Sequence, residues 1–231
     1  MIKFKHIILG AIFILGFLFS GYSQDTTSRW DNLLWLGNKV AWAKDQWNVS
    51  GELQIRLENN AQSLDQWFFE VFPTYQVNKN LSFSIPMRFA VTSEFFEFRP
   101  GVSAVLKMYP WERTQINHQV MWQVDIDPNQ TKHGLRYAVF FNVVTKNKKW
   151  IPNAALGIFY RWRDEYLGLE FIRVGAGVTY VLDVKHKLNF GYYTGVAYSA
   201  EGSSFIGVPL VQLLINITKD YKYVPANYIN F

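Results

Sequence analysis

The chain contains no cysteine, only four histidines and few charged residues. The absence of cysteine excludes disulfides, thiolate metal sites and a lipid-modified N-terminal cysteine. Charged residues make up 18% of the 231 residues and hydrophobic residues 49%, a composition that excludes intrinsic disorder. The net charge is only +5 and no long run of basic residues occurs, so the sequence does not predict a nucleic-acid binder.

Only one long apolar run occurs, and it lies near the N-terminus. Two lysines precede the apolar segment Ile7–Phe19, and small residues that fit a cleavage site end at Ser23. A helix of this segment would span about 20 Å, which is short of the roughly 30 Å hydrocarbon core of a bilayer. We therefore expect residues 1–23 to be a signal peptide and residues 24–231 to form one exported domain. A retained anchor helix is the alternative.

The rest of the chain alternates between apolar and polar residues. In Trp47–Glu58 the odd-numbered positions are apolar or glycine, and the even-numbered positions are polar. A period of two over this length predicts a strand with one apolar and one polar face. We expect eleven such strands, approximately at residues 33–43, 47–58, 66–77, 81–92, 95–108, 115–126, 135–146, 150–162, 169–183, 187–199 and 205–218.

Strand length and connections distinguish a membrane barrel from a soluble β-sandwich, the main alternative fold. The expected strands are about 11–15 residues long, whereas strands of soluble proteins average about five or six. Short polar connections such as Lys44–Gln46 alternate with longer ones such as Asp127–Gly134, and tryptophans flank both kinds, as in outer-membrane barrels. The sequence predicts an all-β protein, a transmembrane antiparallel up-and-down β-barrel in the cell outer membrane.

The eleven expected segments do not by themselves give the number of strands, because closed bacterial barrels have even counts. Adding the tail Tyr221–Phe231 gives twelve strands, although Pro225 cannot donate a hydrogen bond to a neighbouring strand. Omitting Leu33–Ala43 gives ten, which agrees with the alternation of short and long connections. We expect about twelve strands, with ten as the alternative.

Short motifs near the start of the expected barrel carry a family resemblance. They are Leu34-Trp35, the strand that contains Glu52, Arg56 and Glu58, the Asp65-Gln66-Trp67 segment, and Asn78-Lys79-Asn80 before Arg88, with Gly134–Tyr137 and Leu188–Tyr192 matching more loosely. In these motifs the chain resembles a bacterial family of outer-membrane barrels known as a domain of unknown function, DUF2490. The resemblance implies an outer-membrane barrel and implies no particular activity.

Charged residues fall on the polar face of the expected strands, where they would line the lumen. A lysine or arginine that faces lipid near the bilayer midplane costs about 2–4 kcal/mol, so this segregation supports the barrel independently. The expected lumen-facing cations are Arg56, Arg88, Arg99, Lys107, Arg136, Arg161, Arg163 and Arg173. The expected lumen-facing anions are Glu52, Glu58, Glu70, Glu97, Asp125 and Asp183.

Two interpretations of these charges remain open. In the first, arginine–carboxylate pairs fill a narrow lumen as a structural network. In the second, an arginine-lined channel passes acidic solutes, because planar guanidinium groups bind carboxylates through two hydrogen bonds. Arg161, Arg163 and Arg173 flank one connection on neighbouring strands, so we expect them to crowd one side of the lumen. The residues expected to serve either role are Glu52, Arg56, Arg88, Glu97, Arg99, Asp125, Arg136, Arg161, Arg163 and Arg173.

An outer-membrane enzyme that acts on lipid or envelope substrates is the alternative function. His118 falls on the lipid-facing side of its strand and His186 in a polar turn, which leaves His133 as the one candidate catalytic base. No Gly-x-Ser-x-Gly or His-Glu-x-x-His motif accompanies it, and Asp125 and Asp127 are too few ligands for a calcium site. We therefore expect no enzyme activity, no cofactor and no metal.

The expected location also predicts partners and the effect of substitutions. We expect membrane lipids, the barrel-assembly machinery during biogenesis and, if the lumen is open, small anionic solutes as partners. The period of two places Leu53 against lipid and Gln54 in the lumen. We therefore expect Leu53→Arg to impair assembly and Gln54→Arg to be tolerated.

Overall fold

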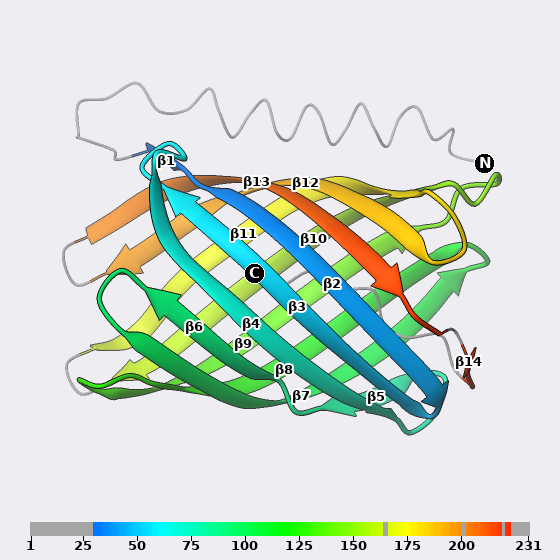
Figure 1. The fold of residues 1–231 in the computed structure, drawn as a ribbon, viewed down its shortest axis with the longest axis horizontal. Coiled ribbons are helices and arrows are strands. Elements are labelled where there is room, and N and C mark those ends of the chain that lie inside the picture. Colours follow the sequence, from blue (N-terminus) through cyan, green and yellow to red (C-terminus); the bar gives the residue numbers. More distant parts are fainter. Residues whose placement is uncertain (1–29, 164–165, 200–201, 219, 223–231) are drawn as a thin grey trace.

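The computed structural model describes residues 30–163, 166–199, 202–218 and 220–222, which form a β-barrel (Figure 1). The strands are β1 (Trp30–Asn32), β2 (Leu34–Asp45), β3 (Trp47–Glu58), β4 (Ser63–Gln76), β5 (Leu81–Ser84), β6 (Met87–Thr92), β7 (Phe96–Trp111), β8 (Thr114–Ile126), β9 (Thr131–Val143), β10 (Trp150–Arg163), β11 (Tyr166–Val181), β12 (His186–Ser199), β13 (Gly202–Asn216) and β14 (Asp220–Tyr221). In these residues no helix is long and apolar enough to cross a bilayer. The expected signal peptide lies outside the described residues.

Eleven strands close the barrel within the described part of the chain, which confirms the expected fold class. Consecutive strands from β2 to β13 pair antiparallel, with β5 and β6 as two halves of one strand between β4 and β7. Parallel pairing of Leu210–Asn216 in β13 with Trp35–Ala41 in β2 then closes the sheet. β1 and β14 continue this seam, because β1 pairs in parallel with β13 and β14 with β2.

The strand number is eleven, between the twelve and ten considered from the sequence. An odd number of up-and-down strands makes the first and last strands parallel, and a parallel ladder satisfies the backbone hydrogen bonds of both edges. Leu33–Ala43, which had no partner in the ten-strand arrangement, corresponds to β2 and pairs on both sides. The expected twelfth strand overlaps the described residues only at β14 and Lys222, and residues 223–231 lie outside them.

The connections lie at two rims, which we name by their first connections. The β2–β3 rim carries Gln46 and residues 77–80, 112–113, 144–149 and 182–185, and the β3–β4 rim carries residues 59–62, 93–95 and 127–130. The expected alternation of short and long connections is wrong, because β4 and β9 begin at Ser63 and Thr131, before their expected starts. The alternation pattern predicts these two strands to be shorter than they are, because their first residues are mostly polar.

The expected strand at residues 81–92 is interrupted at Ile85 and Pro86. Proline has no N–H group and cannot donate to a neighbouring strand. The Pro86 carbonyl still accepts a hydrogen bond of 2.8 Å from the Gly101 amide, and the Ile85 amide donates to Pro73 at 3.1 Å. The two halves therefore stay in one strand position despite the break.

Side chains alternate between the two faces of the barrel wall as the sequence predicts. In β3, Leu53 and Ile55 are 42% and 40% exposed, whereas Glu52 and Gln54 are 2% and 0% exposed. Large apolar residues are exposed on the outer face of every strand position from β2 to β12. A soluble β-sandwich buries its apolar faces, so this exterior is the reverse of that alternative and fits a lipid environment.

Exposed tryptophans mark the β2–β3 rim. Trp42 lies near the end of β2, and Trp47, Trp111 and Trp150 begin or end strands at this rim; the four are 39–65% exposed. Trp47 packs against Tyr75, with ring centroids 5.0 Å apart, and Trp150 packs against Tyr180 at 4.5 Å. Aromatic residues at this level match the interfacial belt of membrane barrels.

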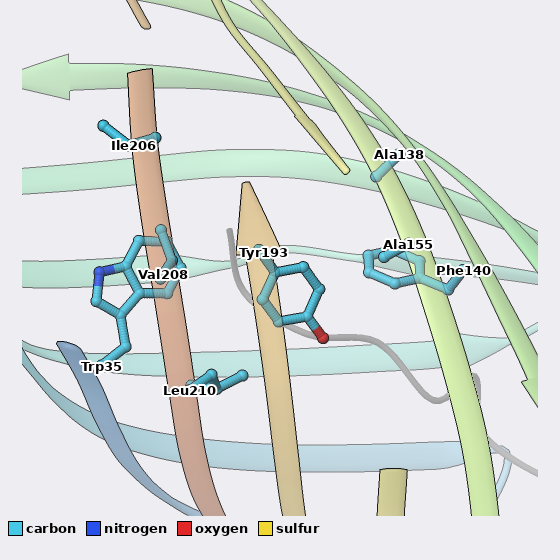
Figure 2. Packing of buried hydrophobic residues seen from close by; sticks show 8 residues of the cluster. All are labelled: Trp35, Ala138, Phe140, Ala155, Tyr193, Ile206, Val208 and Leu210. Carbon is cyan, nitrogen blue, oxygen red and sulfur yellow. The ribbon is translucent and has the colours of Figure 1, made fainter. Parts of the chain in front are cut away.

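An apolar cluster lies inside the barrel beside the closing seam (Figure 2). It comprises Trp35 of β2, Ala138 and Phe140 of β9, Ala155 of β10, Tyr193 of β12, and Ile206, Val208 and Leu210 of β13. Tyr193 and Val208 are 0% exposed. Gly175 of β11 leaves room for this packing, since a Cβ atom there would lie 2.4 Å from both the Tyr193 ring and the Tyr192 carbonyl oxygen.

We expect Gly175→Ala to lower the free energy of unfolding by about 1–3 kcal/mol, because overpacking must displace both a ring and the backbone. Denaturant unfolding of the refolded protein in lipid vesicles measures this change. Gly51→Ala is the control, since its Cβ atom would meet only the Phe69 ring at an ordinary 3.5 Å. Equal stability of the Gly175→Ala variant and the native protein would contradict the packing described.

Candidate functional site

Most buried charges of the interior lie in the half of the barrel near the β3–β4 rim. Arg56, Arg88, Asp125 and Arg161 each lie within a few residues of the end of a strand that finishes at this rim. The other half contains mainly uncharged buried polar residues, such as Gln76, Ser82, Asn117, Thr179 and Asn189, together with the buried Lys107. Buried charged side chains are therefore concentrated in one half of the barrel along its axis.

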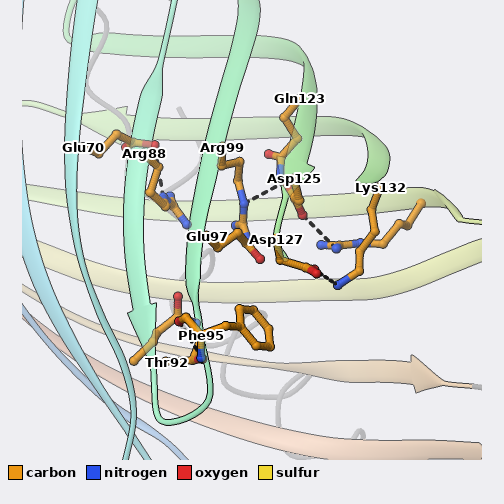
Figure 3. A network of polar contacts seen from close by, with 12 residues as sticks. Glu70, Arg88, Thr92, Phe95, Glu97, Arg99, Gln123, Asp125, Asp127 and Lys132 are labelled. Atoms are coloured by element: carbon orange, nitrogen blue, oxygen red, sulfur yellow. Dashed lines mark hydrogen bonds and ion pairs between the residues drawn. The ribbon is translucent and has the colours of Figure 1, made fainter. Parts of the chain in front are cut away.

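Asp125 of β8 is the centre of the largest ion-pair network (Figure 3). Its Oδ1 atom lies 2.8 Å from Arg99 Nε of β7, and its Oδ2 atom lies 2.7 Å from Arg161 Nη1 of β10. Arg99 also pairs with Glu97, and Arg161 with Glu170 of β11. The network therefore joins four strands, including β8 and β10, which are not neighbours in the sheet.

Two smaller polar groups join further strands. Arg88 Nε of β6 donates to Glu70 Oε1 of β4 at 3.2 Å, and the two residues are direct cross-strand partners. Glu52 Oε1 accepts hydrogen bonds from Gln54 Nε2 at 3.1 Å and from Gln212 Nε2 at 2.8 Å. Because Gln212 belongs to β13, the second bond reaches across the parallel seam that closes the barrel.

Arg56 and Arg173 differ from the arginines of these networks because the described residues give them no carboxylate partner. The Arg56 guanidinium carbon lies 3.8 Å from the centroid of the Trp35 ring, and that of Arg173 lies 5.2 Å from the same centroid. Arg56 Nε donates to Gln54 Oε1 at 2.7 Å. These two cations are therefore held mainly against aromatic faces.

Nearly all the candidate site residues have described side chains in the barrel interior. Glu52, Arg56, Arg88, Glu97, Asp125, Arg136 and Arg161 are buried, and Arg99 and Arg173 are half-buried. The side chain of Arg163 lies outside the described residues. Glu70 and Lys107 are also buried. Whether these residues contact a solute stays a proposal.

Two expectations about the charges are corrected by the structure. Asp183 does not face the lumen, because it lies in the exposed β11–β12 turn. The expected crowding of Arg161 and Arg173 is also wrong, since the register places Arg173 opposite Gly157, four residues or about 13 Å along β10 from Arg161.

Sequence reasoning missed Glu170 because a β-bulge reverses the alternation locally. Phe159 pairs with Phe171 and Tyr160 pairs with Leu169, so Glu170 has no partner in β10. A bulge redirects the side chain of the extra residue, and Glu170 thereby reaches Arg161. Asp65 occupies the same kind of position between β3 and β4. Both bulges place a carboxylate near the β3–β4 rim, and no sequence pattern marks them.

The three described histidines do not assemble a catalytic group. His118 Nδ1 lies 2.8 Å from the Tyr137 hydroxyl, and the His133 ring stacks on Trp122 with centroids 5.8 Å apart. His186 pairs with Asp183 in the β11–β12 turn. In the described ranges no group of three or more histidine, aspartate or glutamate residues has the arrangement of a metal site.

Asp183 closes the β11–β12 turn. Its Oδ1 atom accepts hydrogen bonds from the Lys185 and His186 amides at 2.6 and 2.8 Å, and Oδ2 lies 2.8 Å from His186 Nδ1. The side-chain hydrogen bond with His186, followed by the backbone bonds, lowers the pKa of Asp183 to about 2 from its ordinary 3.8. Because the folded-state pKa is lowered, the stabilisation is complete above the ordinary pKa and is lost as the pH falls towards 2.

We expect His186→Ala to raise the pKa of Asp183 towards 3.8, because the largest cause of its lowering is removed. Carboxyl-carbon NMR titration of the detergent-solubilised protein measures the shift. His133→Ala is the matched control, since the His133 ring stacks on Trp122 and its removal should leave the pKa of Asp183 unchanged. An Asp183 pKa that is unchanged by His186→Ala would contradict this assignment.

A closed β-sheet with an apolar exterior and a buried, ion-paired interior defines a transmembrane β-barrel. The family model described as "Protein of unknown function (DUF2490)" matches residues 34–205, and the chain belongs to this family. The match confirms the resemblance found in the sequence.

The solved structures that are similar to this chain include two of a porin. The "KdgM porin" is 12% identical, with 68% of this chain and 81% of that chain covered at a TM-score of 0.45. The "KdgM porin in complex with disordered oligogalacturonate" is 13% identical, with 72% and 85% covered at a TM-score of 0.46. No curated protein matches the sequence.

Proposed function

We propose that the protein is an integral barrel of the cell outer membrane whose lumen is closed to free ion flow in its resting state. The observation that carries this proposal is the burial of interior polar residues at every level between the rims. Arg56 and Arg88 near the β3–β4 rim are 6% and 2% exposed, Gln119 is 1% exposed, and Gln76 and Lys107 near the other rim are 1% and 0% exposed. A water-filled pore would leave such residues exposed.

The membrane location rests on the exterior of the barrel. Its exposed leucine, valine, phenylalanine and tryptophan residues would contact lipid, and lipids are therefore the partners that this surface supports. Residues 1–23 would serve as the signal peptide, residues 24–231 would form the single exported domain, and the barrel-assembly machinery would insert it. N-terminal sequencing of the protein from the outer-membrane fraction tests the export step, with Gln24 as the expected first residue.

The structural interpretation of the lumen has more support than an open, arginine-lined pore. Arg88, Arg99 and Arg161 each pair with a carboxylate, and Gln212 and Glu52 connect the two sides of the closing seam. Buried charge pairs with further hydrogen bonds hold strands in fixed positions, and removal of one partner leaves an uncompensated charge. The proposed role is therefore that of a rigid outer-membrane barrel with a closed lumen.

Single-channel recording in planar bilayers tests the closed lumen. We expect no steady conductance from the refolded native protein. The double variant with Glu70→Ala and Arg88→Ala should show conductance steps, because it removes two buried side chains that pair with each other. Glu94→Gln, in the exposed 93–95 connection, is the control that should remain silent. Steady steps from the native protein would show that the lumen is open.

A further inference from the structure

We infer that Arg56 and Arg173, together with Trp35, form a binding site for an oxyanion, a carboxylate or phosphate group of a small solute. The site lies in the charged half of the interior, towards the β3–β4 rim. This inference rests on the proposed barrel but not on the lumen being closed. It assigns a ligand class to the two arginines that the ion-pair networks leave out.

The site is built on a row in which aromatic rings and guanidinium groups alternate. Arg173 lies over the Phe171 ring at 4.1 Å as well as over Trp35, and Arg56 lies over the Phe68 ring at 5.0 Å as well as over Trp35. The Arg56 and Arg173 guanidinium carbons lie within about 9 Å of each other, because 3.8 Å and 5.2 Å separate them from the same ring centroid.

The row continues to a third arginine that already has a partner. The Arg88 guanidinium carbon lies 4.0 Å from the centroid of the Phe68 ring, and Arg88 Nε donates to Glu70. Three arginines and one glutamate give this row an excess of positive charge. Glu70 is engaged by Arg88, so the excess belongs to Arg56 and Arg173.

Within the described part of the chain, the hydrogen-bonding capacity of the two arginines is largely unused. Arg56 is 6% exposed, its Nε atom donates to Gln54, and its Nη2 atom is buried without a partner. The Nε atom of Arg173 is also buried without a partner. A guanidinium group has five N–H donors, and a buried donor without an acceptor destabilises the structure.

The charged groups that the structure describes around the two arginines do not supply the missing acceptor. Arg88, Arg173 and Arg99 repel Arg56, and Asp65 attracts it. Glu170 and Asp65 attract Arg173, and Arg88 repels it. Glu170 is paired with Arg161, and Asp65 accepts a hydrogen bond from Gln66 Nε2 at 3.2 Å. Neither carboxylate forms an ion pair with Arg56 or Arg173 among the described contacts.

The chemistry of a stacked guanidinium group selects an oxyanion. Aromatic rings contact the flat faces of the group and partly offset its charge, but they offer no acceptor to the N–H donors at its edge. The oxygens of a carboxylate or phosphate bind in the plane of these donors, often through two parallel hydrogen bonds. Chloride carries the same sign of charge and lacks this geometry. Arg173 is only half-buried, which leaves one side of the site partly accessible.

Thermal unfolding and isothermal titration calorimetry of the full-length mature protein in detergent test the site. The probes are sodium malonate and sodium phosphate, each compared with sodium chloride at equal ionic strength. We expect malonate or phosphate to raise the unfolding temperature of the native protein above its value in chloride, because a ligand that binds only the folded state stabilises it. A rise in unfolding temperature with malonate alone identifies a carboxylate site, and a rise with phosphate identifies a phosphate site.

The double variant with Arg56→Gln and Arg173→Gln should weaken anion binding at least tenfold. Lys149→Gln, which removes an exposed cation at the other rim, is the control and should bind as the native protein does. Arg56→Lys keeps the charge and serves as a second variant, which should also bind more weakly because a lysine cannot form the two parallel bonds.

Two results would overturn the inference. The first is a native protein that responds to neither anion beyond the effect of chloride. The second is anion binding as strong as that of the native protein in both the Arg56→Lys variant and the double variant. Neither result depends on conductance, so failure of the anion site is distinguishable from failure of the closed-lumen proposal.

Discussion

Asp125→Asn is expected to lower the free energy of unfolding by about 3–5 kcal/mol, because it removes the carboxylate that Arg99 and Arg161 share. The side chain of Asp125 is 2% exposed, so solvent cannot replace the lost charge. Much of a typical folding stability of about 5–15 kcal/mol would be lost. Urea unfolding of the refolded barrel in lipid vesicles, followed by tryptophan fluorescence, measures the change.

Two further variants separate the network from a general effect of charge. Glu94→Gln removes one negative charge from an exposed connection at the same rim and should change stability by less than about 0.5 kcal/mol. Combining Asp125→Asn with Arg161→Gln should cost less than the sum of the two single changes, because each single change already removes the ion pair between Asp125 and Arg161. A loss below about 1 kcal/mol for Asp125→Asn would show that the network is not structural.

Leu53→Arg is expected to destabilise the barrel by about 2–4 kcal/mol and to reduce the folded fraction after refolding into lipid vesicles. Leu53 lies midway along β3 and is 42% exposed on the apolar outer face, where an arginine would face hydrocarbon. The folded fraction is measured from the different gel mobility of unheated and heated samples. Val184→Arg is the control, because Val184 is 74% exposed in the β11–β12 turn outside the strands.

The contacts of Gln54 lead us to expect that Gln54→Arg destabilises the barrel, in contrast to the tolerance that the sequence pattern predicts. Gln54 faces the interior as expected, but it is 0% exposed, donates to Glu52 at 3.1 Å and accepts from Arg56 at 2.7 Å. An arginine at this position would lose the bond to Arg56 and add a cation beside it.

Equal and small effects of Leu53→Arg and Val184→Arg would contradict the assignment of the outer face to lipid.

The period-two pattern determined which face of each strand carries charge, because successive side chains of a strand point to opposite sides. This rule placed Glu52, Arg56 and Arg88 in the interior and Leu53 on the exterior. It failed at Glu170, where the β-bulge adds one residue and redirects the side chain. A bulge depends on how two strands are aligned, and neither strand shows it alone.

Pairing between residues distant in sequence also required the structure. The sequence marked Arg99, Asp125 and Arg161 as interior residues but did not reveal that one carboxylate serves both arginines. It likewise left Trp35 as an aromatic residue of the first strand, whereas the closed barrel brings Arg56 and Arg173 to the same ring. Such contacts depend on barrel curvature and strand register, which fix the distances across the interior.

The sequence by itself determined the fold class, the family, the approximate positions of eleven strands and the polarity of both barrel faces. These features follow from local alternation and composition, which each segment carries independently. Only the tertiary structure decided the parallel closure of β13 on β2, the bulges and the partner of each buried charge. The physical reason is that closure satisfies the hydrogen bonds of two distant edge strands at once, and only that closure sets which interior side chains meet.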